Sequence, residues 1–339
     1  MAADVQLSRR TALRGMAAFA AMNCLRAPAA FAQTPEATTA DQSDANGVAA
    51  FSDPEASAEE LAQAWFNLLI LASGEDAAGS GSSDPAAALA IMQPYLDPAF
   101  QLQRASGVRY VATDYAPATV EAYTIQDVRE TRPADNLIVA RYAVQASEST
   151  LGGTNVVLSD VLAPRLSVFR WDDAAAMWLM VSHANFNIPV ATICEKEPLQ
   201  PALNPMVPTT HDDVALGVSL VEAAAAAAVA GDTLPVLDPQ VQVQTAAGYG
   251  YTTTAERPGE TKLKPNVRHD YLITRHDDVI VASYRSAPSG EVNAVEVASE
   301  ESPRMITFRL NEEGEWKAIA TAYFSTVASV PDGVDCTPA

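Results

Sequence analysis

The sequence contains two copies of one fifteen-residue segment. Leu96–Tyr110 and Leu237–Tyr251 align without gaps and are identical at eight positions, including Leu-Asp-Pro and two spaced glutamines. A second matching pair, Pro164–Arg170 and Pro303–Arg309, lies at nearly the same offset. Matches that share an offset indicate that a whole domain is present twice. The 339 residues are therefore predicted to form two domains of about 125 to 140 residues, each large enough to bury one core.

The N-terminus has the features of an export signal. Arg9 and Arg10 precede a modestly apolar run and a small-residue sequence that ends at Ala32. The pair resembles a twin-arginine signal, although Ala12 stands where that pattern usually carries phenylalanine. A membrane anchor is the alternative, but it needs roughly 20 apolar residues and this run is about half that. Residues 1–32 are predicted to be removed, which makes the protein periplasmic or secreted in a bacterium.

Export changes how the cysteines are interpreted. Cys24 leaves with the signal, whereas Cys194 and Cys336 remain, each after the last predicted strand of its repeat. An even number of cysteines in an oxidising compartment favours a disulfide. We therefore predict a bond between Cys194 and Cys336 that joins the two domains, with two free thiols as the alternative.

The charge of the chain limits its partners. The formal net charge is −21, and removing residues 1–32 takes away four arginines and one aspartate, which leaves −24. Such a field repels phosphate backbones and anionic lipids, so nucleic-acid and membrane-surface partners are not expected. The acidic residues are dispersed, which favours a role in solubility over the steering of a cationic ligand.

The predicted order of elements in each repeat is helices first and strands afterwards. Residues 33–56 lack periodicity and are predicted to be a disordered leader. Ser57 and Glu60 form a capping-box pattern that begins a helix ending near Ser73, and Asp84 begins a second helix that ends near Gln93. From Phe100 the apolar period changes to two, and the predicted strands are 99–105, 108–113, 119–131, 136–148, 158–171 and 176–188.

The second unit repeats this order with one helix. The helix is predicted over 213–230, and the strands over 240–246, 249–255, 262–275, 279–287, 302–310 and 316–327. Four prolines between Glu195 and Thr210 indicate a linker. The predicted boundaries are therefore 57–194 for domain 1, 195–211 for the linker and 212–336 for domain 2, and the fold class is α+β.

The last strand of each repeat carries a family resemblance. Trp178–Asn187, after a helix layer and a run of strands, is similar to the nuclear transport factor two-like, or SnoaL-like, superfamily, and Trp316–Ser325 is similar in the second unit. The resemblance implies two tandem cystatin-like domains, each with helices packed on a curved antiparallel sheet around a cone-shaped cavity. Its members include isomerases, dehydratases, epoxide hydrolases and non-catalytic binding or assembly domains, so it names no activity.

The resemblance also implies that the two domains pair. Members often dimerise through the outer faces of their sheets, so a tandem chain is expected to be an intramolecular pseudo-dimer. Strand alternation places Gln101 and Gln103 on one face, and Gln242 and Gln244 on the equivalent face. These rows line either a polar seam between the sheets or an ordinary solvated face.

Domain 1 is the better candidate for a ligand site. His183, Asn185 and Asn187 share one face of its last strand, where domain 2 has threonine, tyrosine and serine. One imidazole beside two amides can take part in proton transfer. A hydrogen-bonded structural histidine is the alternative, and strand parity does not say whether this face points toward the cavity or toward the seam.

Three further candidates have counterparts in domain 2. Arg165 could clamp a carboxylate at a pocket rim, and Tyr110 and Tyr142 could contact a ligand. Their recurrence as Arg304, Tyr251 and Tyr284 favours an internal ion pair and core aromatics instead. Asp127 likewise recurs as Asp270, which indicates a shared structural bond rather than a catalytic carboxylate, so the catalytic residues stay unassigned.

Two His-Asp-Asp sequences are weak metal candidates. The one at His211 lies at a helix start, where aspartate caps the helix, and the one at His276 lies at a predicted hairpin turn. Their spacing does not suit a metal, and the sequence has no nucleotide, zinc-protease or hydrolase motif. We therefore expect no metal and no cofactor.

These observations lead to two functional hypotheses. The first is an exported, non-catalytic binding protein that holds a small apolar or amphipathic molecule or docks a protein. The alternative is a SnoaL-like isomerase, dehydratase or hydrolase acting in the domain 1 cavity.

Overall fold

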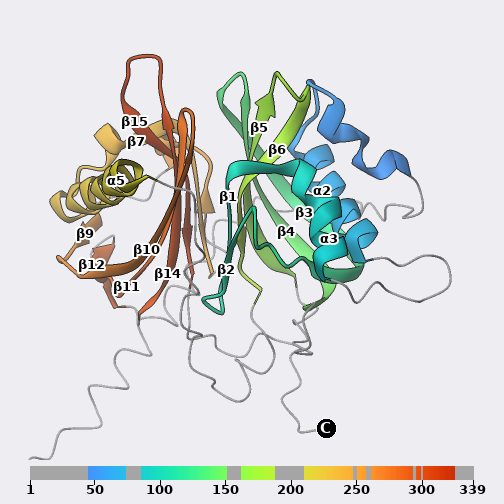
Figure 1. The fold of residues 1–339 in the computed structure, drawn as a ribbon. Coiled ribbons are helices and arrows are strands. Elements are labelled where there is room, and N and C mark those ends of the chain that lie inside the picture. The colour runs from blue at the N-terminus through green and yellow to red at the C-terminus, as the bar shows by residue number, and fades with distance from the viewer. Residues whose placement is uncertain are drawn as a thin grey trace, which may run out of the picture.

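The computed structural model describes residues 45–73, 85–150, 162–187, 210–246, 250–256, 261–292, 295–298 and 301–324. The expected signal peptide, nearly all of the linker, and both Cys194 and Cys336 lie outside these residues. The described chain forms two α+β domains whose sheets face each other, with the α-helices on the outer sides (Figure 1).

Domain 1 begins with a helical layer. It consists of η1 (Ala45–Ser52), α2 (Ala58–Ser73), α3 (Pro85–Met92) and η2 (Gln93–Tyr95). The six strands that follow are β1 (Leu96–Arg104), β2 (Arg109–Val111), β3 (Ala118–Ala134), β4 (Leu137–Thr150), β5 (Ala163–Asp172) and β6 (Met177–Asn185). They form one sheet in the order β2-β1-β6-β5-β4-β3. Neighbouring strands are antiparallel except β1 and β6, which are parallel.

Domain 2 has the same sheet and a thinner helical layer. It begins with α5 (His211–Ala230) and η3 (Leu234–Val236), followed by β7 (Leu237–Thr245), β8 (Gly250–Tyr251), η4 (Thr254–Glu256), β10 (Arg268–His276), β11 (Val279–Ser286), β14 (Ser302–Leu310) and β15 (Trp316–Tyr323). The strand order β8-β7-β15-β14-β11-β10 is that of domain 1, element for element. The parallel pair is again the first strand with the last.

Two parts of the structure differ from the sequence-based expectations. The strand expected over 262–275 is divided, because Pro265 cannot donate to a ladder and interrupts it. Its first part, β9 (Thr261–Leu263), joins a small sheet with β12 (Ser289–Val292) and β13 (Val295–Ala298), which were not predicted. Part of the expected disordered leader is also ordered, because Phe51 of η1 is fully buried between Tyr95 and Phe169.

The helices begin where their capping residues stand. Glu60 accepts a hydrogen bond from the Ser57 main-chain N–H at 2.8 Å, and its own N–H donates to Ser57 Oγ at 3.3 Å. The hydrogen bonds from Ser57 lower the pKa of Glu60. In α5, Thr210 accepts from the Asp213 N–H, and Gly231 ends the helix with a φ of 78°.

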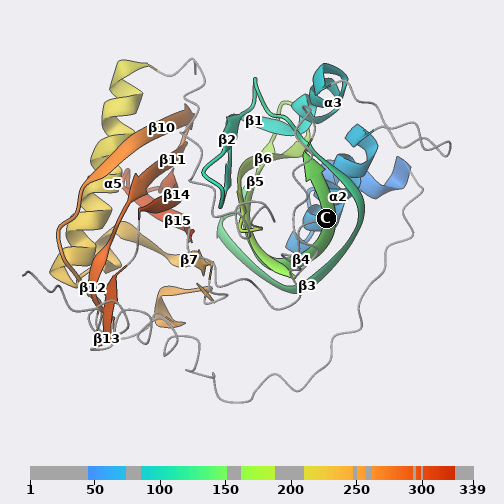
Figure 2. The same cartoon turned by 90° about the horizontal axis from the view of Figure 1, so that it is seen from below.

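The helix α5 differs from α2 in how little of it is covered. Ten of the sixteen residues of α2 are buried, whereas in α5 only Gly217 and Val221 are buried. The helix lies along the face of domain 2 that points away from domain 1 (Figure 2), and it packs on β10, β9 and β11. By length and composition α5 could cross a membrane, although one such helix is weak evidence for a span.

The repeated Leu-Asp-Pro sequence builds a buried ion pair in each domain. Asp97 accepts from the Ala99 N–H at 2.7 Å and pairs with Arg170 at 2.7 Å, and both side chains are buried. Asp238 does the same with the Gln240 N–H and with Arg309, at 2.9 Å for each. A buried ion pair therefore recurs at Arg170 and Arg309, five residues after Arg165 and Arg304, and the ion pair expected for Arg165 and Arg304 stays a prediction.

Asp127 and Asp270 recur because of backbone geometry. Their φ angles are 56° and 54°, and the strand register shifts next to each of them. Aspartate tolerates this left-handed conformation better than most residues, and the extra residue produces a β-bulge. The expected shared side-chain bond is therefore corrected to a shared bulge in the long strand.

The outer faces of the two sheets contact each other through an equivalent pair of glutamines. Gln101 Nε2 donates to the carbonyl oxygens of Leu272 and Val281 and to Thr274 Oγ1, at 2.9 to 3.1 Å. Gln242 Nε2 donates to the matching atoms of Arg129, Val139 and Thr131, at 2.7 to 3.2 Å. Each glutamine thus enters the opposite domain at the same place.

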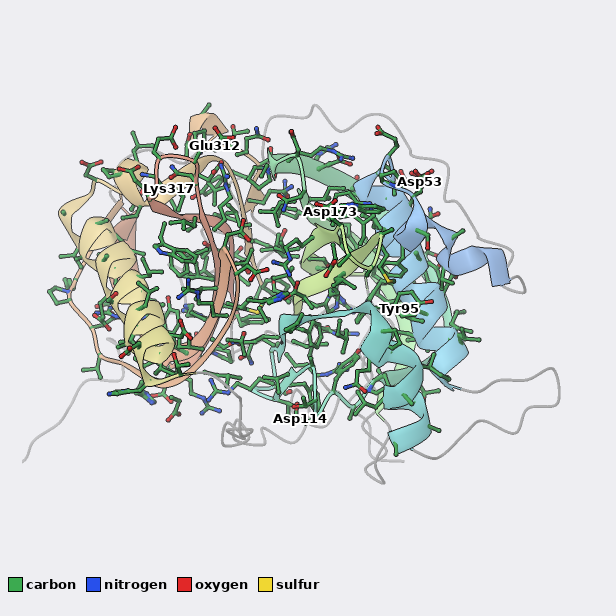
Figure 3. All side chains as sticks on the ribbon, turned by 45° about the horizontal axis from the view of Figure 1, so that its top comes forward. Asp53, Tyr95, Asp114, Asp173, Glu312 and Lys317 are labelled. Atoms are coloured by element: carbon green, nitrogen blue, oxygen red, sulfur yellow. The ribbon has the colours of Figure 1, made fainter. Side chains whose placement is uncertain are left out.

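Apolar side chains surround these glutamines. They form one core cluster that draws residues from both sheets, including Val139, Val168, Val281 and the stacked rings of Phe186 and Phe324, whose centroids are 4.5 Å apart. Figure 3 shows side chains filling the space between the sheets. Buried amides require hydrogen bonds, so the glutamines and the apolar cluster together define one relative placement of the domains.

We expect Asp97→Asn to lower the free energy of unfolding by about 3 kcal/mol, because it removes the buried carboxylate at 2.7 Å from Arg170 and leaves that guanidinium to the exposed Asp277 and Asp278, at 3.5 and 3.7 Å. Urea unfolding of the two proteins would measure the difference. Glu315→Gln is the matched control, because the Glu315 carboxylate is exposed and its ion pair with Lys317 should contribute little. An equal effect of both variants would contradict this account of the repeated aspartate.

Candidate functional site

The structure settles which way His183 points. Its ring lies against Trp65 of α2 with centroids 5.6 Å apart, so it faces the helical layer of domain 1. The preceding residue, Ser182, contacts Thr307 of domain 2 at 2.8 Å. Because neighbouring strand residues point to opposite faces, the interdomain interface and the His183 side are separate surfaces of β6.

His183 ends a hydrogen-bonded chain across three neighbouring strands. Ser167 Oγ of β5 lies 2.9 Å from His183 Nδ1, and Tyr142 OH of β4 lies 3.0 Å from Ser167 Oγ. Ser167 and His183 are directly opposite in the strand register. A chain in which Tyr142 donates to Ser167 and Ser167 donates to Nδ1 keeps the imidazole neutral, with its proton on Nε2.

The surroundings of His183 also favour the neutral ring. Burial lowers the pKa of His183 well below its ordinary value of 6.5, and the nearby charges of Arg165 and Arg104 lower it further. The imidazole is therefore uncharged at neutral pH. A neutral imidazole can donate at one nitrogen and accept at the other.

Aromatic rings line the same side of the sheet. Trp65 lies 6.3 Å from Phe100 and 6.0 Å from Tyr115, with the Tyr115 ring stacked on it at 22°. The indole of Trp65 is completely buried, yet its Nε1–H has no hydrogen-bond partner among the described residues. A buried donor without an acceptor is uncommon in native structures.

The other sequence-predicted residues lie around this cluster. Arg165 is fully buried and donates to the carbonyl oxygens of Pro164 and Ala163, at 3.0 and 3.4 Å. It lies opposite Asn185 in the register, and Asn185 accepts from the Asn187 N–H at 2.9 Å. Tyr110 is more peripheral and contacts Tyr115 edge-on at 5.8 Å.

Four residues of this cluster, Trp65, Phe100, Tyr115 and Ser167, were not among the sequence-based candidates. Trp65 and Tyr115 look like ordinary core aromatics in the sequence, and nothing in their spacing separates them from the rest of the core. Ser167 had a signal in the sequence. The repeat aligns it with Ile306, so a polar residue in domain 1 replaces an apolar residue of domain 2 within a strand that otherwise matches.

Domain 2 has no equivalent chain. Tyr284, Ile306 and Thr321 occupy the places of Tyr142, Ser167 and His183, and isoleucine cannot link the other two by hydrogen bonds. Tyr284 instead stacks on Tyr271 with centroids 5.7 Å apart, and burial raises its pKa. The polar chain is a feature of domain 1 alone among the described parts of the two sheets.

The sequences considered as metal candidates have other contacts. His276 ends β10 and contacts Arg170 and, at 3.2 Å, Asp97 of domain 1. His211 is exposed at the start of α5. Within the described ranges, no group of three or more histidine, cysteine or acidic side chains is arranged to hold a metal ion.

Comparison with known proteins gives structural neighbours only. No family model matches the sequence, and no curated protein matches it. An NTF2-like protein from Cytophaga hutchinsonii is 20% identical over 34% of this chain and 99% of its own, with a TM-score of 0.29.

Two further structural neighbours have similarly low sequence identities and TM-scores. An NTF2-like protein with a cystatin-like fold from Novosphingobium aromaticivorans is 15% identical over 35% of this chain and 85% of its own, with a TM-score of 0.28. The association domain of C. elegans CaMKII is 9% identical over 33% of this chain and 98% of its own, with a TM-score of 0.27. Each neighbour spans about a third of the chain, and the α+β assignment rests on the strand topology itself.

The lowered pKa of His183 predicts a pH-dependent stability. Below about pH 6.5 the unfolded chain binds a proton at this residue that the folded chain does not, so the free energy of unfolding falls as the pH falls. This residue should therefore account for part of the loss of stability between pH 7 and 5. His183→Asn removes the titrating group and should flatten the profile measured by urea unfolding.

Exposed His211 offers the control for this experiment. His211→Asn should leave the pH profile of the wild type unchanged, because this side chain is exposed in the folded chain. A wild-type profile that is already flat between pH 7 and 5 would contradict the burial argument for His183.

Proposed function

We propose that the protein is an exported binding protein that holds a small amphipathic molecule between α2 and the sheet of domain 1. The observation that carries the proposal is the buried Trp65 Nε1–H, which lies beside the neutral His183 without an acceptor among the described residues. An unsatisfied buried donor costs about 1 to 3 kcal/mol. A ligand that supplies an acceptor atom would recover that free energy.

The neighbours of Trp65 support an amphipathic ligand over a strongly polar one. Phe100 and Tyr115 offer aromatic surface next to the indole. The polar groups converge on a smaller area, where Tyr142 is hydrogen-bonded to Ser167 and Ser167 to His183. A mostly apolar site with a few placed polar groups is the usual composition of a small-molecule site.

Domain 2 is the less suitable location for this ligand. Its counterpart of Ser167 is Ile306, and the chain to Thr321 is broken there. The large core of domain 1 also extends over η1, α2 and α3, whereas the core of domain 2 rests on one mostly uncovered helix. Domain 1 can therefore exclude water from a bound molecule more completely.

We expect Trp65→Phe to weaken the binding of 8-anilinonaphthalene-1-sulfonate, an amphipathic aromatic anion used as the probe, by about tenfold. The substitution keeps an aromatic ring against Tyr115 and removes the N–H. Probe fluorescence would measure the affinity, and native mass spectrometry of the purified protein would detect a molecule that copurifies. Trp316→Phe in domain 2 is the matched control and should leave the probe affinity unchanged.

The repeat supplies a second pair of variants. Ser167→Ile copies the domain 2 residue into domain 1 and should also weaken probe binding, because it removes the acceptor and donor between Tyr142 and His183. Ile306→Ser in domain 2 should not. A protein that binds no probe and shows only its own mass would contradict the proposed function.

Proton-transfer chemistry in the same place is the second candidate function. The Tyr142–Ser167–His183 chain favours it, because a neutral imidazole linked to hydroxyl groups can move a proton to or from a ligand. A dehydratase or an epoxide hydrolase would convert its substrate into a product that differs from it by the mass of one water, so both species should be released from the purified protein. His183→Asn should then leave one species, with binding retained.

The export part of the proposal is tested by the intact mass. The mature protein is expected to begin at Gln33, and Arg9→Lys with Arg10→Lys should leave the full-length precursor in the cytoplasm, because lysine keeps the charge and loses the recognised arginine pair. A mass about two units lower before reduction would support the bond between Cys194 and Cys336. An unprocessed wild-type chain would contradict export.

A further inference from the structure

At the centre of the interface between the two sheets, both domains make the same contacts. At its two ends, the contacting residues of the two domains differ. At one end, Arg109 of domain 1 donates to the Asp270 carbonyl at 2.6 Å and reaches the Ser283 carbonyl at 3.5 Å. At the other end, Arg141 of domain 1 lies against Gly250 of domain 2. A Cβ atom at Gly250 would stand only 2.6 Å from Arg141 Nη1.

These four residues are two repeat-related pairs. Arg109 and Gly250 are equivalent, because each lies opposite the second glutamine of its repeat in the register. Arg141 and Ser283 are equivalent, because each precedes the tyrosine of the matching strands β4 and β11. At both ends, therefore, an arginine of domain 1 meets a small residue of domain 2.

These contacts would not form between two copies of domain 1 or between two copies of domain 2. Two copies of domain 1 would bring Arg109 against Arg141 at both ends, with two guanidinium groups in the volume that now holds one. Two copies of domain 2 would bring Gly250 against Ser283 and leave that volume unfilled. Like charges at a buried contact are costly, and so are unfilled gaps in a packed interface.

The contact at Arg109 is buried, whereas Arg141 is half-buried. Arg109 is 2% exposed, and burial lowers its pKa to about 10, with the nearby Arg285 lowering it further and Asp270 raising it. In the Ser283→Arg protein a second arginine at this point would add an unfavourable charge of the same sign. In a pair of domain 1 copies Ala143 stands in the place of Arg285, so the misfit there comes from Arg109 and Arg141 sharing one volume. A Cβ atom at Gly250 would meet both Arg141 Nη1 and the Val243 carbonyl oxygen of its own sheet, each at 2.6 Å, so glycine suits the neighbouring strand as well as the arginine.

We infer that these ends are a specificity device: the outer sheet face of domain 1 accepts domain 2 and rejects a second copy of domain 1. The central glutamines are self-complementary and would serve any pairing of the two domains. Selection comes from the ends, where a repulsive arrangement is built against the wrong partner.

The two central glutamines also differ in their hydrogen bonds. Ser283 donates to the side-chain carbonyl of Gln101, whereas Arg141 stands in the equivalent place beside Gln242. The Gln242 side-chain carbonyl is buried and has no hydrogen-bond partner among the described residues. One hydrogen bond is thus absent where arginine replaces serine, which is the type of stability loss that accompanies specificity.

The test places an arginine opposite Arg109 at one end of the interface, within the full-length chain. Ser283→Arg brings a second guanidinium against Arg109, as in a pair of domain 1 copies, and should increase the unfolding constant at least tenfold. Adding Arg109→Gly gives this end of the interface a glycine opposite an arginine, which is the arrangement already present at the other end between Gly250 and Arg141. The double variant should recover most of the loss, although Arg109→Gly alone destabilises the protein.

Ser283→Gln is the matched control, because it adds length and removes the hydroxyl without adding charge. It should cost less than Ser283→Arg, and Arg109→Gly should not rescue it to the same extent. Urea unfolding and hydrogen exchange of the β1 and β11 amides would measure the four proteins. Equal losses for arginine and glutamine, or additive losses in the double variant, would overturn the inference.

Discussion

The contact between the two sheets determines most of what the rest of the molecule can do. Gln101 and Gln242 each insert a buried amide into the opposite domain, and their hydrogen bonds go to main-chain carbonyls that cannot move independently of the strands. The surrounding apolar side chains exclude water, which raises the cost of any displacement. With their outer faces occupied, both sheets have one face left for a ligand, the face toward the helices.

The two domains use that remaining face differently. In domain 1, α2 buries Trp65 against the sheet, and the polar chain from Tyr142 to His183 lies beneath it. In domain 2, α5 leaves most of its surface uncovered, and Ile306 interrupts the chain. The two domains therefore share the glutamine contacts at the centre of the interface and differ at its ends and in their interiors, where side chains can change without altering the strand topology.

Sequence reasoning predicted the fold well and the site in part. The duplication, the capping box at Ser57 and the strand alternation were sufficient for the order of elements, because these signals depend on local geometry. The division of the strand near Pro265 and the burial of Phe51 were missed, since both depend on what lies beside them. His183 and Tyr142 were named as candidates, whereas Trp65, which comes from a distant helix, carries no local signal.

The sequence by itself determined that there are two copies of one α+β unit, because repetition and periodicity are properties of the chain. Only the tertiary structure decided that Arg170 is the ion-pair partner of Asp97, that Asp127 recurs for its positive φ, and that His183 faces the helices. Strand parity divides residues between two faces but does not say which face is inside. Packing between elements far apart in the chain makes that decision.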